Sequence, residues 1–597
     1  MGQGSSSEVR APPHELLTKE LASRFAERCF TPLELLSLKD VFKSLADHEQ
    51  GVLYLKEDTV ARFLEIPDLL GVSPILFQIV SYIGAFPFLH DAPAVLGLEQ
   101  IVMVITILTK RYERVLAKGA SDRMKLLFGS MAVYDRKHPE PTARDRAGTL
   151  EQADTELEAA EDSDGDFDDL VLEAFDYLHS TKFFKKQASI SVRDAIVPAD
   201  NFRKLIMLLL LIAPLDAQES LSLYSDRLAG ESLESLRLTA ECILAAFLDV
   251  EQAPGLRFDR FNTVIPASMP FLFDGFTPLF EHFLFSKNLD FHKHLSEAKD
   301  TPIPDLVQPL LQDTASVMNI NTLSQLSFFL PGSSLFRRLR LLYSGDDDGF
   351  SMGSFETKVF NWRAPTILLV RGTRLLEDTS DRNTGTDSAF LTTLPPRRFR
   401  PSRGGTGDRL TFGVYISQPW KHTHRECFGG DDTLLFQLEP FHDVLHASTL
   451  NKDYASFTKP SPSTPHAGIS FGCPPPQSTQ TYRRASTIAL GTVSLVLDGS
   501  FEFGCFTHDF TSKGGAFGTS QTRKFDFQER FEIESLEVWG CGSDEEAKNQ
   551  AERWAWEARE AEARRRINLG TGDIEADRAL LEMAGLVGGN RSGGSMG

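Results

Sequence analysis

Cysteine is scarce in this 597-residue sequence, and the six cysteines present form no CxxC pair. Such spacing is typical of reduced thiols in the cytosol and not of a disulfide framework. The N-terminus lacks the apolar segment of a signal peptide. The longest strongly apolar run, Leu205–Ala213, has nine residues, too few to cross ~30 Å of hydrocarbon as a helix. These absences exclude secreted disulfide-rich and helical membrane-spanning proteins, so we expect a soluble, cytoplasmic chain.

Positive charge is also in short supply. The chain has 62 Lys and Arg against 83 Asp and Glu, a formal net charge of −21. A surplus of negative charge repels phosphate backbones, so we expect no direct binding of nucleic acid. Hydrophobic residues make up 41% of the chain and charged residues 24%, which are ordinary values for globular proteins. The composition therefore predicts a folded protein with a large core.

The first residues match an acylation pattern. Gly2 follows Met1, and Ser6 stands where N-myristoylation requires a Ser or Thr. A flexible terminus rich in Gly and Ser would have the same composition. One myristoyl chain binds a bilayer only weakly, with an association constant of ~10⁴ M⁻¹. We therefore predict lipidation at Gly2 and weak, reversible contact with a membrane, after a flexible tail at residues 1–13.

Residues 14–140 have the apolar spacing of helices. Within them, residues 46–57 align with a twelve-residue calcium loop, with Gly51 at the sharp turn and Glu57 at the last ligand position. The early ligand positions supply no carboxylate and are Ala46, His48 and Gln50. We interpret this region as a degenerate, structural EF-hand-like unit.

An acidic stretch follows at residues 141–169, before a second helical region at 170–316. Carboxylates at residues 162–173 have the spacing of a calcium loop, but Phe167 occupies the position of the turn glycine. Runs of like charge are usually solvated linkers. We favour a linker and keep a calcium-responsive switch as an alternative.

Beyond residue 319 short β-rich runs alternate with turn residues. The runs predicted to be strands are Leu339–Tyr343, Thr366–Val370, Phe412–Ile416, Leu434–Leu438, Val493–Leu497 and Phe531–Val538. Two segments rich in Ser, Thr, Pro and Gly, 377–409 and 447–484, separate some of these strands. Loops of that length are functional or disordered when they have no structure of their own.

Residues 317–542 resemble the TLDc domain. The motifs that carry the resemblance are Leu341–Ser344, Asp348–Ser351, Pro365–Val370, Gly413–Tyr415, Leu435–Pro440, Leu495–Asp498, Gly504–Cys505 and Ile533–Gly540. The acylation pattern and the EF-hand-like half ahead of them resemble a fungal branch of this family. The expected fold class is therefore α+β: a helical EF-hand-like N-terminal half, a TLDc β-sandwich with flanking helices, and a C-terminal helix.

The resemblance implies functions that the composition does not show. TLDc proteins have no established catalytic centre or cofactor, interact with the vacuolar proton-pumping ATPase (V-ATPase), and are linked to oxidative-stress resistance. The fungal branch is further linked to telomere capping, which we interpret as an indirect link because the chain is acidic. The resemblance thus implies a cytoplasmic protein that is peripheral on the cytosolic face of the vacuolar membrane.

Two short motifs suggest an enzyme instead. Gly349–Gly353 matches the G-x-S-x-G elbow of serine hydrolases around Ser351. Three aspartates precede it and would oppose an oxyanion, so we favour a helix N-cap at Ser351 or Ser354. Three candidate zinc ligands lie close together without a second cluster: His422, His424 and Cys427. A hydrolase or a metal-dependent enzyme remains the alternative function.

Residues 543–597 begin with a predicted helix that carries a narrow stripe of small residues around one tryptophan. The stripe consists of Ala547, Ala551, Trp554, Ala558 and Ala561. Such a face suits close approach to a partner, although the helix could also fold back on its own domain. In TLDc relatives a terminal helix is implicated in engaging the proton pump. We therefore expect a non-enzymatic adaptor or regulator with no catalytic residue, metal or cofactor, which binds V-ATPase through this stripe.

Overall fold

The structure of the protein is a computed structural model. The residues that it describes are 13–49, 51–116, 123–134, 169–180, 195–247, 255–285, 311, 313, 315–331, 335–375, 390–391, 394–395, 399, 408–423, 425–459, 468–475, 488–542, 545, 548–556 and 559. The predicted acylation site at Gly2 and the carboxylates at residues 162–168 lie outside this part of the chain.

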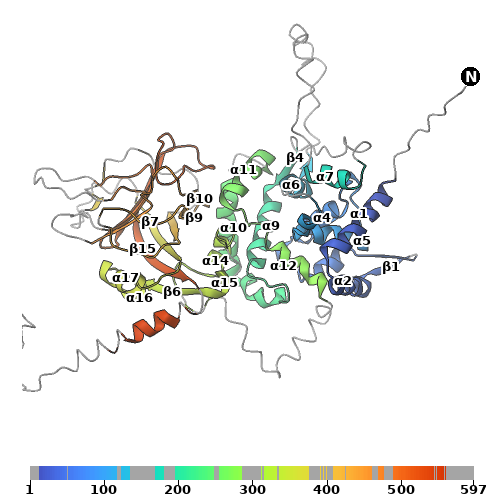
Figure 1. The fold of residues 1–597 in the computed structure, drawn as a ribbon, viewed down its shortest axis with the longest axis horizontal. Coiled ribbons are helices and arrows are strands. Elements are labelled where there is room, and N and C mark those ends of the chain that lie inside the picture. Colours follow the sequence, from blue (N-terminus) through green and yellow to red (C-terminus); the bar gives the residue numbers. More distant parts are fainter. Residues whose placement is uncertain are drawn as a thin grey trace, which may run out of the picture. The chain divides into compact units, whose positions relative to one another are not determined.

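Two helix–loop–helix units open the N-terminal half (Figure 1). Their elements are α1 (His14–Cys29), α2 (Pro32–Leu45), β1 (Asp47–Glu49), β2 (Val52–Tyr54), α3 (Glu57–Phe63), α4 (Ser73–Gly84) and α5 (Leu98–Leu108), followed by α6 (Met124–Met131). Helix α2 begins at a capping box, because Thr31 and Glu34 each accept the other's backbone N–H. A short antiparallel bridge between Leu55 and Leu96 joins the loops of the two units.

The loop between α2 and α3 forms the hairpin β1–β2, with Gly51 at a positive φ of 84°. Its carboxylates are already engaged: the Tyr54 hydroxyl donates to Glu49 at 2.6 Å, and Lys56 lies 3.7 Å from Asp47. The helix–loop–helix form is therefore present, and its carboxylates Asp47 and Glu49 contact neighbouring side chains. The EF-hand-like character of this region stays a prediction.

In a second group of helices, two loops are again joined by short paired strands. It comprises β3 (Val133–Tyr134), α7 (Asp169–Tyr177), β4 (Ala195–Pro198), α9 (Ala199–Ile212), the 3₁₀ helix η5 (Leu221–Leu228), α10 (Gly230–Phe247), β5 (Gly255–Leu256), α11 (Phe258–Ser268) and α12 (Phe276–Glu281). Strand β4 pairs with β5 between the two loops, at Val197 and Leu256. The apolar run 205–213 forms most of α9 and is buried as a core helix, as its sequence predicts.

An antiparallel sheet fills the TLDc region and has ten strands among the described residues. Its strands are β6 (Leu339–Ser344), β7 (Thr366–Arg374), β8 (Arg409–Ile416), β9 (Leu434–Glu439), β10 (Asp443–His446), β11 (Ala455–Thr458), β12 (Gly468–Phe471), β13 (Val493–Asp498), β14 (Phe503–His508) and β15 (Phe527–Cys541). The order is β10-β9-β8-β7-β15-β14-β13-β12-β11, and β6 also pairs with β15. The predicted α+β class is confirmed.

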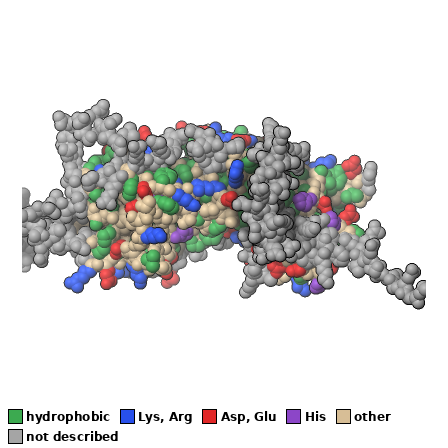
Figure 2. Space-filling view, turned by 90° about the horizontal axis from the view of Figure 1, so that it is seen from above, with side chains coloured by type: hydrophobic (Ala, Val, Ile, Leu, Met, Phe, Trp, Pro, Cys, Tyr) green, Lys and Arg blue, Asp and Glu red, His purple; other side chains and the backbone are tan. Residues whose placement is uncertain are grey.

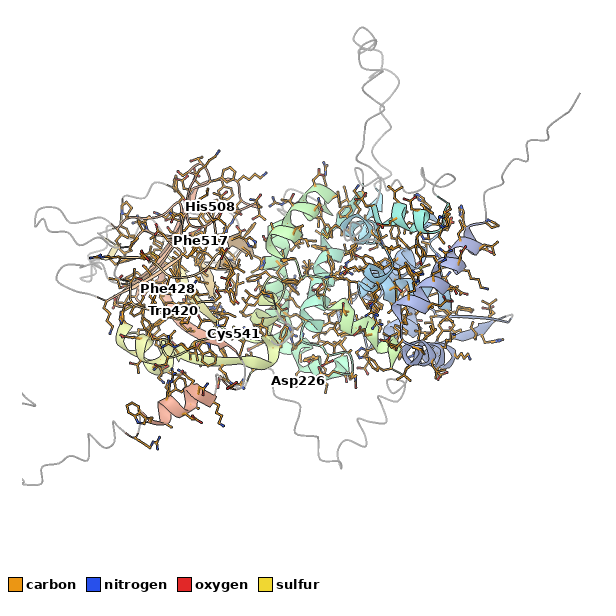
Figure 3. All side chains as sticks on the ribbon, viewed as in Figure 1. Asp226, Trp420, Phe428, His508, Phe517 and Cys541 are labelled. Atoms are coloured by element: carbon orange, nitrogen blue, oxygen red, sulfur yellow. The ribbon has the colours of Figure 1, made fainter. Side chains whose placement is uncertain are left out.

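The sheet curls into two layers. Strands β8 and β14 are three steps apart in the sheet, about 14 Å if it were flat. Yet Phe412 of β8 stacks on Phe506 of β14 with ring centroids 4.6 Å apart. The bend lies in the long strand β15, whose pairing register shifts twice. Aromatic rings also fill the space between the layers, such as Trp420 and Phe428 in Figure 3, whose centroids are 5.4 Å apart.

Four further helices flank the sheet: α14 (Ile320–Leu326), α15 (Leu335–Arg338), α16 (Gly345–Asp348) and α17 (Met352–Val359). Helices α14 and α15 share a buried cluster with β7, β9 and β15, which includes Leu326, Leu369 and Trp539. Phe355 of α17 packs on Tyr343 of β6 at 5.1 Å. The flanking helices predicted by the family resemblance are therefore present.

One expectation is wrong. The segment 447–484 is not a loop throughout, because it supplies strands β11 and β12 to the sheet. Each strand is only four residues long, and each carries a serine whose side chains meet across the pair, with Ser456 Oγ 2.7 Å from Ser470 Oγ. Short strands with polar residues give a weak periodic signal, so the composition of the segment hid them.

Candidate functional site

Ser351, the candidate nucleophile, is the N-cap of α17. Its Oγ accepts the backbone N–H of Ser354 at 3.1 Å, and Ser354 Oγ donates to the carbonyl of Asp348 at 2.8 Å. This is the hydrogen-bond pattern of a capped helix start. The predicted cap is confirmed at Ser351, and the G-x-S-x-G match has a structural explanation.

Replacing Ser351 by alanine is expected to lower the free energy of unfolding by about 1 kcal/mol, because the first turn of α17 loses its cap. Ser351→Asp keeps an acceptor at this position and serves as the control, with little loss expected. Urea denaturation of the three proteins measures the difference. An unchanged midpoint in Ser351→Ala would contradict the capping role.

The candidate zinc ligands have separate partners. His422 Nε2 lies 2.8 Å from Glu356 Oε1 of α17, and Cys427 Sγ donates to the carbonyl of Cys473 at 3.7 Å. Burial raises the pKa of Cys427 to about 12. His424 lies outside the described residues. Within the described chain, no group of three or more His, Cys, Asp or Glu side chains is placed to hold a metal ion.

Four further thiols have raised pKa values. Burial raises the pKa of Cys29 and Cys473 to about 11, and that of Cys242 and Cys541 to about 12. A thiol must ionise to act as a nucleophile or to be oxidised readily. These four cysteines are therefore poor candidates for direct redox chemistry.

The C-terminal segment 542–597 forms a compact unit separate from residues 1–541. Residues 548–556 are helical in it. Ala551 is exposed and Trp554 is half-buried, while Trp556 is 57% exposed. The remaining residues of the predicted stripe lie outside the described chain: Ala547, Ala558 and Ala561. Reasoning from the stripe missed Trp556, which offers the largest exposed apolar surface of this helix.

Within residues 1–541, His442 ties the helical half to the sheet. The side chain is fully buried in the turn between β9 and β10. Its Nε2 lies 3.2 Å from the carbonyl of Ser268 in α11, and its Nδ1 lies 3.0 Å from Gln325 Nε2 of α14. A carbonyl can only accept, so Nε2 carries the proton and Nδ1 accepts from the amide. The backbone N–H of His442 also donates to Cys242 of α10 at 3.0 Å.

This histidine makes the stability of the chain sensitive to acid. Burial lowers the pKa of His442 from 6.5 to about 4. Between pH 6.5 and 4 the unfolded chain takes up a proton that the folded chain does not, so stability falls as the pH falls through this window. We expect a loss of roughly 3 kcal/mol from this group, and a shallower loss in His442→Gln. Denaturant titrations across the window measure both slopes, and equal slopes would contradict this role.

A second buried site involves residues of β10, β14 and the segment before β15. Arg523 Nη2 and Nε lie 2.9 and 3.0 Å from one carboxylate oxygen of Asp443, and the two side chains are 3% and 1% exposed. Ser520 Oγ donates to the same oxygen at 2.6 Å, while the guanidinium lies over Phe527. His508, which Figure 3 labels nearby, accepts the backbone N–H of Ser520. The arrangement is a closed structural network and not an accessible catalytic site.

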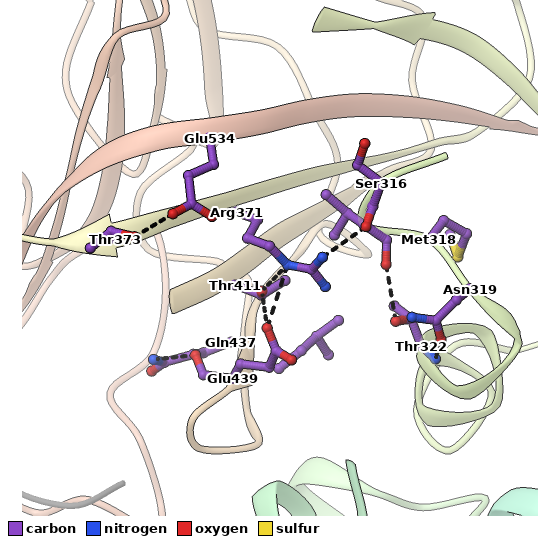
Figure 4. Close-up of polar contacts among 12 residues, drawn as sticks. Ser316, Met318, Asn319, Thr322, Arg371, Thr373, Thr411, Gln437, Glu439 and Glu534 are labelled. Atoms are coloured by element: carbon purple, nitrogen blue, oxygen red, sulfur yellow. Dashed lines mark hydrogen bonds and ion pairs between the residues drawn. The ribbon is translucent and has the colours of Figure 1, made fainter. Parts of the chain in front are cut away.

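A polar cleft of about 300 Å³ lies between α10 and the ends of β7, β8 and β9. Figure 4 shows its centre, where Arg371 donates to the carbonyl of Ser316 at 2.7 Å and lies 3.6 Å from Glu439. Thr411 Oγ1 donates to the same carboxylate at 2.5 Å. The arginine is thus used to hold neighbouring strands and residue 316 together.

The surface charge is mixed. On the face drawn in Figure 2, Lys and Arg side chains are interspersed with Asp and Glu. No helix of the described chain combines the length and the apolar character that a membrane crossing requires. The candidate sites among the described residues are therefore a capped helix start, buried hydrogen-bond networks and an exposed tryptophan.

The C-terminal half of the chain matches a known domain family. Residues 311–542 match the sequence model of the TLDc domain. The match begins just before α14 and ends at the close of β15, so it covers the curled sheet and its flanking helices.

The relatives extend this similarity to the whole chain. The protein named restriction of telomere capping protein 5 from Neurospora crassa is 63% identical over 603 aligned residues, which cover all of both chains. Proteins of the same name from Colletotrichum graminicola and Aspergillus clavatus are 61% and 35% identical, again over both complete chains. The chain therefore belongs to the restriction of telomere capping protein 5 family of TLDc-domain proteins.

Proposed function

We propose that this protein is a non-enzymatic adaptor or regulator that binds the vacuolar proton-pumping ATPase. Its partner-binding surface is the C-terminal helix, and its weak membrane contact is a myristoyl chain on Gly2. The observation that carries the proposal is the exposure of the helix at residues 548–556, in which the Trp556 side chain is 57% exposed. Tryptophan in such a position is a frequent anchor of protein interfaces.

The candidate reactive groups support an adaptor over an enzyme. Ser351 is occupied as a helix cap, His422 is paired with Glu356, and the pKa of Cys427 is raised to about 12. None of these arrangements couples a nucleophile to a base, which hydrolysis would require. Activity-based labelling with a fluorophosphonate tests this directly: labelling that disappears in Ser351→Ala would contradict the proposal.

The partner is inferred from the family and from the chemistry of the helix. The name of the relatives refers to telomere capping, and we propose that any such link in this chain is indirect because its net charge of −21 repels DNA. We likewise propose that any link to oxidative stress runs through the partner, because burial raises the pKa values of five of the six thiols: Cys29, Cys242, Cys427, Cys473 and Cys541. The proposed location is the cytoplasm, with peripheral and reversible association with the cytosolic face of the vacuolar membrane.

Affinity purification of the tagged full chain tests the identity of the partner. Subunits of the proton pump are expected to be recovered in stoichiometric amounts, and an unrelated tagged protein serves as the control. Recovery of nucleic-acid-binding complexes without the pump would contradict the proposal.

Gly2→Ala tests the membrane contact. We expect the variant to move from the membrane fraction toward the soluble fraction, because it cannot be acylated. Ser5→Ala leaves Gly2 and Ser6 intact and is the control. An unchanged distribution of Gly2→Ala would rule out acylation as the tether.

A further inference from the structure

An apolar groove of about 770 Å³ lies between the first two helix–loop–helix units. Its apolar lining comes from α2, the β1–β2 hairpin, the loop before α5 and the first residue of α5: Phe42, Val52, Leu53, Tyr54, Val95 and Leu98. Charged residues, among them Lys39, Lys43 and Glu99, line the same groove. Val52 and Val95 are 62% and 39% exposed. An apolar ligand that covers these aliphatic side chains removes them from water, which is favourable for binding.

The two walls of the groove are held in a fixed register. The backbone N–H of Leu55 donates to the carbonyl of Leu96 at 2.8 Å, and the reverse bond is 3.0 Å long. These residues directly follow Tyr54 and Val95, which line the groove on opposite walls. A preformed apolar site binds a ligand without the cost of ordering its own walls.

The first described residues of the chain lie at the edge of the groove. His14 Nδ1 lies 2.8 Å from Asp91, and the ring stacks on Phe88 with centroids 4.0 Å apart. Both partners belong to the segment between α4 and α5. The next residue, Glu15, lines the groove itself. Residues 1–12 therefore join the described chain beside this site.

The distance from Gly2 to the groove is within reach. Gly2 precedes His14 by twelve positions, which span at most ~40 Å when fully extended. A random-coil chain of twelve residues has a typical end-to-end distance of ~20 Å. A ligand attached through such a linker has an effective concentration on the order of millimolar at a nearby site.

We propose that the groove holds the myristoyl chain of Gly2 when the protein is not on a membrane. This inference rests on the acylation of Gly2 proposed above. The groove is large enough, since an apolar cavity of ~150 Å³ already accommodates the six carbons of benzene. Methylene groups gain free energy similarly in an apolar groove and in a bilayer, so the acyl chain can exchange between the two. The groove thereby regulates the membrane contact.

Binding of a dansyl-labelled fatty acid to the full chain tests this occupant. The unacylated Gly2→Ala protein is expected to bind the probe saturably. The protein acylated by co-expressed N-myristoyltransferase should bind the probe at least ~10-fold more weakly, because its own acyl chain competes at high effective concentration. In the Gly2→Ala background, Val95→Trp fills the groove and should weaken probe binding at least ~10-fold. Val133→Trp alters a valine of β3 that is similarly exposed, at 43%, and outside the groove, so its binding should not change.

Vesicle sedimentation gives the second readout. Acylated Val95→Trp should partition into phosphatidylcholine vesicles more strongly than the acylated wild type, while acylated Val133→Trp should match the wild type. Equal partitioning of all three would overturn the proposal, as would equal probe affinity in the acylated and Gly2→Ala proteins. If intact mass confirms the acyl group, such results overturn the groove as its binding site but do not contradict the acylation of Gly2. An intact mass without the acyl group would instead overturn both proposals.

Discussion

Replacing Arg523 by methionine is expected to destabilise the TLDc domain by about 3–5 kcal/mol, because the carboxylate of Asp443 is left buried without its cation. The pair is 3% and 1% exposed, so water cannot replace the lost charge. Denaturant titration followed by tryptophan fluorescence measures the change, since Trp362, Trp420 and Trp539 are buried in this domain.

An exposed ion pair supplies the control. Arg237 of α10 pairs with Glu241 at 3.2 Å, and its side chain is 50% exposed. Surface pairs contribute little, so Arg237→Met should change stability by less than ~0.5 kcal/mol. The double variant Arg523→Met with Asp443→Leu should be less destabilised than Arg523→Met alone, because no buried charge remains. A loss below ~1 kcal/mol in Arg523→Met would contradict the structural importance of the pair.

Replacing Trp556 by alanine is expected to weaken binding to the purified proton pump at least ~30-fold, or about 2 kcal/mol, if this side chain anchors the interface. The fold should be unaffected because the tryptophan is 57% exposed. Glu552→Ala changes another exposed residue of the same helix and should alter the affinity less than ~3-fold. Surface plasmon resonance on the immobilised pump measures both, and equal affinities of the two variants would contradict an anchor at Trp556.

Local chemistry made much of the sheet and one site predictable from the sequence. The run Thr366–Val370 lies within β7, because a β-branched and aliphatic run between turn residues fits a buried strand. Ser351 was predictable as a cap because its hydrogen-bond partner, Ser354, is only three positions away. Signals of this kind depend on neighbours in the sequence.

Contacts between distant segments could not be predicted in this way. The partners of His442 are 117 and 174 positions away, at Gln325 and Ser268, so nothing near the histidine indicates its role. Strands β11 and β12 were missed for a related reason, because a run of only four residues becomes a strand only through pairing with its neighbours. The apolar groove likewise exists only because Leu55 and Leu96 bring two loops together.

The proposed interaction through the C-terminal helix can be tested by measuring the affinity of the purified proton pump for the full chain and for a chain that ends at Gly542. Residues 1–541 form a compact unit of their own, so the shortened chain should keep its thermal unfolding midpoint. We expect saturable binding of the full chain and an affinity at least ~10-fold lower without residues 543–597. Equal affinities of two equally stable proteins would contradict the claim that the C-terminal helix carries the interaction.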